Sequence, residues 1–292
     1  MRPPSLLLAA GLTGVLAAVA GCAPADDDTA APAASGGATS AASCAPAQLK
    51  TLTAGKLTVG TDDPVYPPWF ADNKPGSGQG FEAAVAYAVA SKLGYTKDQV
   101  AWVRVTFNNA IAPGPKTFDF DINEFSITDE RRQAVDFSSP YYDVTQTVIA
   151  LKGSKIAGAR SVADLKGAKL GAQVGTTSYR SITEVVKPAS QPSVYNNNDD
   201  AKKALQNGQI DGLVVDLPTA FYITGAEITD AVIVGQLPPV AGTPEQFGLV
   251  LDKGSPLTGC VSGAVDALRA DGTLKNLQQQ WLAAAQGAPA LS

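Results

Sequence analysis

The 292-residue sequence contains no histidine, and charged residues make up only 17% of it. Without imidazole, the chain cannot use Ser-His-Asp or Cys-His catalysis, bind zinc or haem through histidine, or respond to pH through histidine. It also lacks a basic excess, because its formal net charge is −5. Nucleic acid is therefore excluded as a partner, since phosphate recognition needs a basic surface. No metal site and no cofactor are predicted.

Cysteine is scarce, with three residues in the chain. This odd count fits a free thiol, a metal-binding pair, or a disulfide plus one specialised cysteine. Cys22 follows an apolar run, residues 6–20, which is too short to span a membrane and has the length of a signal-peptide core. The run ends in Val-Ala-Gly-Cys and resembles a bacterial lipobox, which predicts a lipoprotein signal peptide over 1–21 and lipidation of Cys22. The alternative is an ordinary secretory signal with a chance cysteine.

Residues 22–44 are rich in Ala, Pro, Ser, Gly and Thr and are predicted to be a disordered tether. The Asp triplet at 26–28 indicates solvated charge rather than a calcium site. Removal of the signal peptide leaves Cys44 and Cys260, which flank almost the whole folded region in an oxidising compartment. We therefore predict that they form a disulfide, which in the chain-entropy model contributes ~5 kcal/mol to stability.

Strand-like and helix-like segments alternate through the rest of the chain. Predicted strands lie near 56–61, 101–106, 118–122, 145–151, 168–174, 210–215 and 231–235. Predicted helices lie near 81–93, 199–207, 256–270 and 272–284, with others beginning near 128, 175 and 217. This alternation predicts an α/β architecture with mainly parallel sheets.

Several motifs occur in a fixed order between about residues 50 and 285. They are V-G-T-D (59–62), Y-P-P-W (66–69), G-F-E (80–82), S-I-T-D-E-R-R-Q-A-V-D-F-S-S-P-Y-Y (126–142), D-L-K-G-A-K-L-G-A-Q-V-G-T-T (164–177), G-Q-I-D-G-L-V-V-D (208–216) and R-A-D-G-T-L-K-N-L (269–277). The ordered set resembles the family 3 extracellular solute-binding proteins, the polar-amino-acid receptors of ABC importers.

The resemblance implies a two-lobed periplasmic-binding-protein fold of type II, in which each lobe is a mainly parallel sheet flanked by helices. Lobe 1 is expected from 45–142 and 242–292, and lobe 2 from 147–238, with two hinge crossovers and the ligand in the cleft between them. The predicted disulfide then joins two parts of lobe 1 and leaves the hinge free. We expect a monomer outside the cytoplasmic membrane, anchored by lipid on Cys22, that works with an ABC permease and ATPase.

The same resemblance suggests which residues bind the two charges of an amino acid. Arg131 falls at the family's carboxylate-binding arginine, and a planar guanidinium can hold both carboxylate oxygens. Thr177 would add a backbone N–H at a helix N-terminus, and Ser126 aligns with a residue that contacts both ligand charges. Asp216 matches the ammonium acceptor, although a strand-terminal Asp often only caps a helix. The adjacent Arg132 is expected on the surface.

Aromatic residues are expected to form the walls of the pocket. Tyr66 and Phe107 match positions that sandwich the ligand side chain. Trp69 lies near them, and the sequence leaves open whether it belongs to the core or to the rim.

The sequence departs from the family's pattern around this site. An extra residue lies between Asp62 and Tyr66, Asn123 and Glu124 replace small residues, and Gln173 stands where an apolar residue is common. Asp62 and Glu124 would make the pocket anionic, which favours a cationic or amide-bearing amino acid, with arginine or lysine ahead of glutamine. Glu124 could instead pair with a lysine at the lobe interface.

Two other classes of function compete with a receptor. One is an enzyme on the same fold, such as a cyclohexadienyl-type dehydratase, and the other is a sensory binding module. The sequence shows no base-plus-nucleophile pair, no G-x-S-x-G motif and no phosphate loop. Binding alone explains Arg131 and Asp216. We therefore expect a non-enzymatic receptor that captures a polar amino acid and delivers it to an ABC importer.

Overall fold

The computed structural model describes residues 44–285 and 287–292. The predicted signal peptide, nearly all of the predicted tether, and the lipidated Cys22 lie outside the described residues. Among the helices within the described ranges, none is both long enough and apolar enough to cross a membrane.

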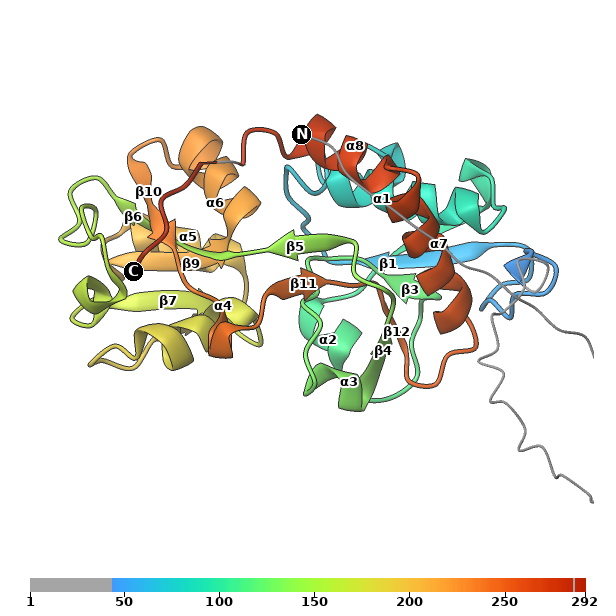
Figure 1. Cartoon of the computed structure of the whole chain (residues 1–292), viewed down its shortest axis with the longest axis horizontal. Coiled ribbons are helices and arrows are strands. Elements are labelled where there is room, and N and C mark those ends of the chain that lie inside the picture. Colours follow the sequence, from blue (N-terminus) through green and yellow to red (C-terminus); the bar gives the residue numbers. More distant parts are fainter. Residues whose placement is uncertain (1–43, 286) are drawn as a thin grey trace, which may run out of the picture. The chain divides into compact units, whose positions relative to one another are not determined.

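Lobe 1 is built on a five-stranded sheet with the strand order β2-β1-β3-β12-β4 (Figure 1). Strand β1 (Leu57–Thr61) pairs in parallel with β2 (Val100–Arg104) and with β3 (Phe120–Asp121). Strand β12 (Val250–Asp252) pairs antiparallel with β3 and with β4 (Val135–Phe137). All five residues of β1 are buried, as expected for a parallel strand covered on both faces.

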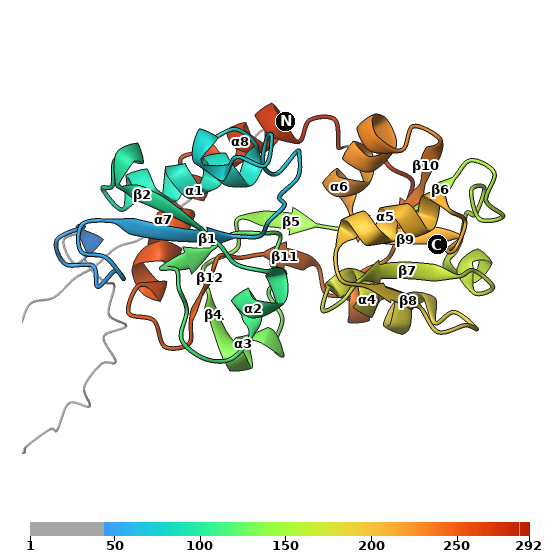
Figure 2. The same ribbon diagram turned by 180° about the vertical axis from the view of Figure 1, so that it is seen from behind.

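Helices cover both faces of this sheet in the two opposite views (Figures 1 and 2). On one side, α1 (Phe81–Lys92), α7 (Thr258–Ala270) and α8 (Thr273–Trp281) pack against one another. The short helices α2 (Phe107–Ile111) and α3 (Arg131–Ala134) lie on the other side and share a separate apolar core with β4 and β12. The Cys44–Cys260 disulfide is present and joins the N-terminal segment to α7, as predicted.

Lobe 2 contains the second five-stranded sheet, with the order β10-β6-β9-β7-β8. Its strands are β6 (Gln146–Leu151), β7 (Leu170–Gln173), β8 (Ser193–Tyr195), β9 (Gly212–Asp216) and β10 (Ala231–Gln236). Strand β7 is parallel to β8 and β9, whereas β6 is antiparallel to β9 and β10. Its helices are α4 (Thr177–Ser181), α5 (Asn198–Gln206) and α6 (Leu217–Tyr222). The predicted two-lobed α/β fold is confirmed.

The two crossovers between the lobes form a small antiparallel ribbon of their own. Strand β5 (Tyr142–Val144) leads from lobe 1 to lobe 2, and β11 (Glu245–Phe247) returns beside it (Figure 2). Glu245 lies opposite Val144, and Phe247 lies opposite Tyr142. Because the ribbon connects both sheets, a side chain on it can contact residues of either lobe.

The last residues of the chain lie on lobe 2, although the sequence-based boundaries placed all of 242–292 in lobe 1. Ala290 forms a parallel bridge with Gln236, and the Leu291 N–H donates to the Gln236 carbonyl at 2.9 Å. The Leu291 side chain is buried in the core of lobe 2. Glycine at 235 makes room for it, since a Cβ there would lie 2.7 Å from Leu291 Cγ. The C-terminal segment is therefore a third connection between the lobes.

Candidate ligand-binding site

A cleft between the lobes brings together all but one of the predicted ligand-binding side chains. The predicted residues that line it are Asp62, Tyr66, Phe107, Glu124 and Arg131 from lobe 1 and Gln173, Thr177 and Asp216 from lobe 2. Ser126 lies just behind the lining, where its Oγ is 3.1 Å from Thr177 Oγ1. Lining residues that sequence reasoning did not select include Thr176, Ser178, Asn198 and Thr219.

Arg131 reaches from the first turn of α3 across the cleft to lobe 2. Its Nη1 donates to the Ser126 carbonyl at 2.7 Å, and its Nη2 donates to the Gly175 carbonyl at 2.9 Å. Its Cζ also lies 5.3 Å from the centre of the Phe107 ring. Burial lowers the pKa of Arg131 to about 10, so the guanidinium stays charged at neutral pH. A guanidinium has five N–H groups, so it retains donors for a ligand carboxylate.

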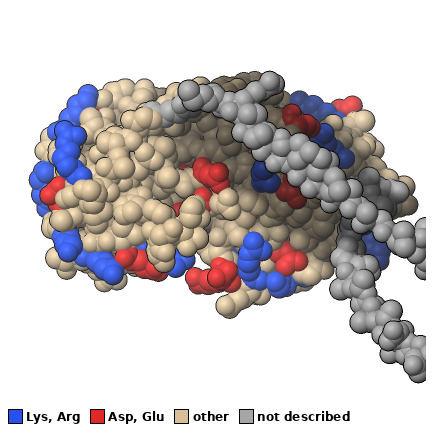
Figure 3. All heavy atoms as spheres, in the orientation of Figure 1, with Lys and Arg blue, Asp and Glu red and all other residues tan. Residues whose placement is uncertain are grey.

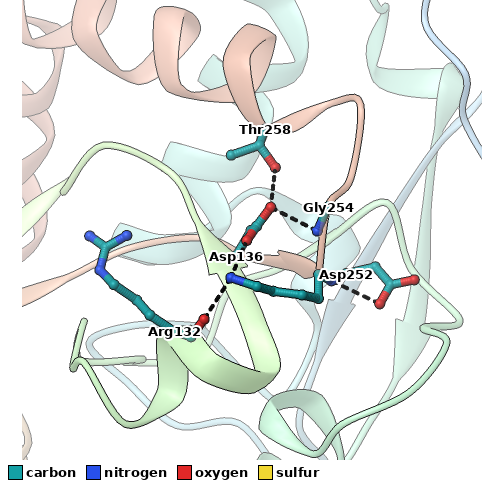
Figure 4. Close-up of polar contacts among 6 residues, drawn as sticks. Arg132, Asp136, Asp252, Gly254 and Thr258 are labelled. Carbon is teal, nitrogen blue, oxygen red and sulfur yellow. Dashed lines mark hydrogen bonds and ion pairs between the residues drawn. The ribbon is translucent and has the colours of Figure 1, made fainter.

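The backbone next to Arg131 is anchored by residues of β4 and of the loop that follows β12. Asp136 on β4 accepts hydrogen bonds from Lys253 Nζ at 3.1 Å and from the Gly254 N–H at 3.0 Å (Figure 4). Lys253 Nζ donates in addition to the Arg132 carbonyl at 2.7 Å. The Arg132 side chain points away from these contacts in Figure 4 and is exposed. Of the two adjacent arginines, only Arg131 thus enters the cleft.

In lobe 2, the end of β7 and the start of α4 place Thr177 at the cleft. The Thr176 hydroxyl caps α4 by accepting from the Tyr179 N–H at 3.2 Å. Gly175 has a φ of +74°, and a Cβ there would lie 2.5 Å from Asn108 Oδ1. A left-handed backbone and a close neighbour both favour glycine, which explains the Gly-Thr-Thr sequence at this turn.

Asp216 ends β9 and directs its carboxylate into the cleft. Its Oδ1 accepts from Gln146 Nε2 at 2.6 Å, and its side chain makes no capping hydrogen bond to α6. Helix capping, the alternative role for this residue, therefore does not occur. Burial, followed by the nearby Glu245 charge, raises the pKa of Asp216 to about 8.

Glu124 occupies a left-handed backbone position, with a φ of +54°. Its N–H donates to Glu82 Oε1 at 2.7 Å, and its Oε2 accepts from Thr219 Oγ1 of lobe 2 at 2.9 Å. Glu124 thus contacts lobe 2 through a threonine rather than through a lysine. Burial and the Asp216 and Glu82 charges raise the pKa of Glu124 well above its usual range.

Two further carboxylates lie behind the cleft and were not selected from the sequence. Glu82, on α1, accepts from the Tyr141 hydroxyl, and burial raises its pKa to about 7. Asp121, on β3, is buried without a hydrogen-bond partner for either oxygen, and burial and the Glu82 charge raise its pKa strongly. Gly60 accommodates Asp121, since a Cβ there would lie 2.3 Å from Asp121 Oδ2. Glu82 stands in the G-F-E motif, whereas Asp121 sits in the alternating segment F-D-F-D-I (118–122), which predicts a strand and gives no functional signal.

Aromatic residues form one side of the site. Phe107 stacks on Phe125 with ring centres 4.8 Å apart, and Tyr66 lies under Lys202 Nζ at 4.7 Å. Trp69 is 1% exposed and therefore belongs to the core, yet its Nε1 donates to Thr219 Oγ1 of lobe 2 at 2.8 Å. Trp69 consequently contributes to the contact between the lobes.

A hydrogen-bond network that sequence reasoning missed joins the lobes beside the crossovers. Glu245 Oε1 accepts from the hydroxyls of Ser126 and Thr177 and from Gln146 Nε2 at 3.0 Å. Ser178 Oγ in turn donates to Gln146 Oε1 at 2.6 Å. Nothing in the surrounding E-Q-F-G sequence distinguishes Glu245 from an exposed surface residue.

The charges at the cleft suit a small cation or zwitterion. Its lining contains three carboxylates, on Asp62, Glu124 and Asp216, and one basic side chain, on Arg131. Within the described residues, no group of acidic, cysteine or histidine side chains is arranged to bind a metal ion.

Comparisons with known proteins identify the family to which this chain belongs. A family model described as bacterial extracellular solute-binding proteins, family 3, matches residues 57–284. The L-arginine-binding protein of Pseudomonas aeruginosa is 31% identical over 239 residues, which cover 80% of this chain and 90% of that protein. An ancestral arginine-binding protein bound to glutamine has a TM-score of 0.65 and 31% identity, covering 78% of this chain and 98% of its own. An ancestral amino acid-binding protein, a precursor of cyclohexadienyl dehydratase, has a TM-score of 0.63 and 32% identity. This match covers 78% of this chain and 95% of that protein.

Proposed function

Because this chain belongs to the bacterial extracellular solute-binding proteins of family 3, we propose that it captures a polar amino acid in its cleft and delivers it to an ABC importer. We further propose that the favoured ligand has a cationic side chain, with arginine or lysine ahead of glutamine. The observation that carries this preference is the excess of carboxylates over Arg131 in the cleft lining.

Each part of such a ligand meets a suitable group. The remaining N–H groups of Arg131 bind the α-carboxylate, and Asp216 accepts from the α-ammonium. Each charge-assisted hydrogen bond of this kind contributes ~1.5–3 kcal/mol. Asp62 and Glu124 then meet the side-chain cation, while Tyr66 and Phe107 contact its aliphatic part. The similar proteins named for arginine support this assignment.

A thermal-shift panel of the twenty amino acids tests the ligand class. A ligand that binds only the native state stabilises it by ~2.7 kcal/mol at a hundredfold excess over Kd. We expect the largest rise in Tm with L-arginine or L-lysine, a smaller one with L-glutamine, and none with L-aspartate or L-glutamate. A response to aspartate or glutamate without one to arginine, lysine or glutamine would contradict the proposed preference.

We propose that the protein binds its ligand without transforming it. The similarity to a precursor of cyclohexadienyl dehydratase makes a dehydratase the alternative to test. Incubation with a cyclohexadienyl substrate should leave its absorbance unchanged, whereas accumulation of an aromatic product would establish the enzyme.

We also propose that the mature protein is a monomer, anchored to the outer face of the cytoplasmic membrane by lipid on Cys22. The support is the apolar run of residues 6–20 followed by Val-Ala-Gly-Cys. In cells fed a labelled fatty acid, the wild-type protein should carry the label and Cys22→Ala should not. Equal recovery of both proteins from the soluble fraction would refute the anchor.

A further inference from the structure

Glu245 lies on the crossover strand β11, at a position where one side chain can contact both lobes. Its neighbour Gln246 is on the opposite face of the strand, where Nε2 donates to Asp143 Oδ1 at 2.7 Å in an exposed contact. The side chain of Glu245 turns the other way, toward Ser126 and Thr177. These two adjacent residues of the same hinge strand thus have separate surroundings.

A single oxygen of Glu245 collects donors from three separate segments. The Ser126 hydroxyl comes from lobe 1 and the Thr177 hydroxyl from lobe 2, while Gln146 Nε2, at 3.0 Å, comes from the start of β6. Ser126 and Thr177 reach the same carboxylate only when the two lobes lie together. This arrangement links the position of the hinge to the closure of the cleft.

The same contacts fix the direction of both hydroxyl protons. Each hydroxyl has one proton and two lone pairs. Because Ser126 and Thr177 both donate to Glu245, neither has a proton left for a second partner, although their oxygens are only 3.1 Å apart. Gln146 Nε2 donates to Thr177 Oγ1 at 3.4 Å and engages one of its lone pairs. Thr177, which lines the cleft, therefore has one lone pair left for a ligand. Lone pairs attract an ammonium group and disfavour a carboxylate.

We propose that Glu245 is a positioning residue that holds the lobes in the closed arrangement and keeps the Thr177 hydroxyl proton turned away from the cleft, so that this hydroxyl accepts from the ligand's α-ammonium group. The second part of this proposal rests on the proposed amino-acid function, whereas the first does not. In this arrangement, Arg131 meets the α-carboxylate, and the Thr177 hydroxyl oxygen accepts from the α-ammonium beside Asp216. Glu245 itself need not contact the ligand, and it does not line the cleft.

The first experiment measures lobe closure without ligand. Small-angle scattering compares wild-type protein with Glu245→Ala, Glu245→Gln and the matched control Gln246→Ala. We expect Glu245→Ala to increase the radius of gyration because Ser126 and Thr177 lose their common acceptor. The radius of gyration of Glu245→Gln should lie between those of wild type and Glu245→Ala, since its amide oxygen still accepts hydrogen bonds. The radius of gyration of Gln246→Ala should match that of wild type. Unfolding is excluded by requiring an unchanged circular dichroism spectrum.

The second experiment separates hydroxyl polarity from a general loss of structure. Calorimetry compares L-arginine with 5-guanidinopentanoate, which lacks only the α-amino group. In Glu245→Ala, Ser126 and Thr177 can bond to each other, which frees one proton to point at the ligand. We expect L-arginine affinity to fall about tenfold and 5-guanidinopentanoate affinity to fall less than about threefold.

The outcomes separate the two parts of the proposal. An equal loss for both ligands, or no loss for either, would overturn the polarity role of Glu245. An unchanged radius of gyration in Glu245→Ala would overturn its role in closure. If wild-type protein binds no amino acid, the proposed function fails, but the ligand-free scattering still decides whether Glu245 holds the lobes together.

Discussion

Arg131 combines two tasks that only a guanidinium can perform together. It donates to backbone carbonyls in both lobes, and it remains the one basic side chain that lines the cleft. A lysine has three donors on one nitrogen and cannot present a planar fork to a carboxylate.

Arg131→Lys should therefore weaken L-arginine binding by roughly 10- to 100-fold, the value of one or two charge-assisted hydrogen bonds. Arg132→Lys is the matched control, because Arg132 is exposed and its backbone carbonyl accepts from Lys253 in either case. Calorimetry on both variants gives the comparison. Similar affinities for the two variants would remove Arg131 from the binding site.

Under the proposed preference, the Glu124 carboxylate selects ligands whose side chain is positively charged. Glu124→Gln keeps the shape of the side chain and an oxygen that can accept from Thr219, but it removes one negative charge from the cleft. L-arginine affinity should fall by about tenfold or more, whereas L-glutamine affinity should change little. Glu184→Gln, an exposed change beside Arg180, provides the control. Parallel changes for both ligands would show that Glu124 does not read charge.

At the scale of single residues, the sequence was informative where a motif fixed the local backbone. Gly175, Thr177 and Asp216 belong to such motifs. Thr177 and Asp216 line the cleft with Arg131, and the Gly175 carbonyl accepts from Arg131. Glu245 was not predictable in this way, because its partner Ser126 lies 119 positions away along the chain. No periodicity or local spacing encodes a contact of that separation.

Among the elements, length largely determined which could be predicted, although the two-residue strand β3 lies within the strand expected near 118–122. Strands β1, β6 and β9 and helices α1 and α7 carry enough residues to show a buried run or a helical period. Strands β4, β5, β8, β11 and β12 have three residues each, too few for either pattern. Three of these five, β5, β11 and β12, form the crossover ribbon or return the chain to lobe 1, so the elements that connect the lobes are among the least predictable.

The C-terminal segment is an element of this kind, and its anchor is Leu291. This side chain is 4% exposed and fills the space left by Gly235 in the core of lobe 2. Leu291→Ala should lower the free energy of unfolding by ~2–4 kcal/mol, as for other buried leucines. Val194→Ala on β8 is the control, since Val194 is 47% exposed in the same lobe. Equal midpoints in urea unfolding for the two variants would show that the segment does not stabilise lobe 2.

On the scale of the whole molecule, the distribution of charge separates the cleft from the outer surface. Lys and Arg gather along the edge of the visible face that lobe 2 forms, while acidic residues appear toward the middle of that face (Figure 3). Exposed basic residues of lobe 2 include Lys152, Lys155, Lys166, Lys169 and Lys187. These exposed basic residues are distinct from the cleft lining, where burial and neighbouring acidic charges raise the pKa values of Glu124 and Asp216.

Raised carboxyl pKa values make the stability of the ligand-free protein depend on pH. Asp216, from an ordinary 3.8, has a pKa of about 8, and Glu82, from 4.5, has a pKa of about 7. Between pH 5 and 8 the folded chain therefore holds protons at these sites that the unfolded chain has released. Stability must then fall as pH rises through this window. Carboxyls with lowered pKa, such as Asp271 at about 2, act in the opposite direction but are fully ionised by pH 5.

A cationic ligand causes these sites to lose their protons. Its positive charge favours the ionised forms of Asp216 and Glu124 beside it, despite the nearby Glu245 carboxylate. L-arginine should therefore bind more tightly at pH 8 than at pH 6 and should release protons at pH 7. Titrations in buffers of different ionisation enthalpy measure that release, and urea unfolding at pH 5.5 and 8 measures the fall in ligand-free stability. Glu124→Gln should release fewer protons, because one of the coupled carboxyls is gone. A flat affinity profile without proton release would show that these carboxyls are already ionised in the empty cleft.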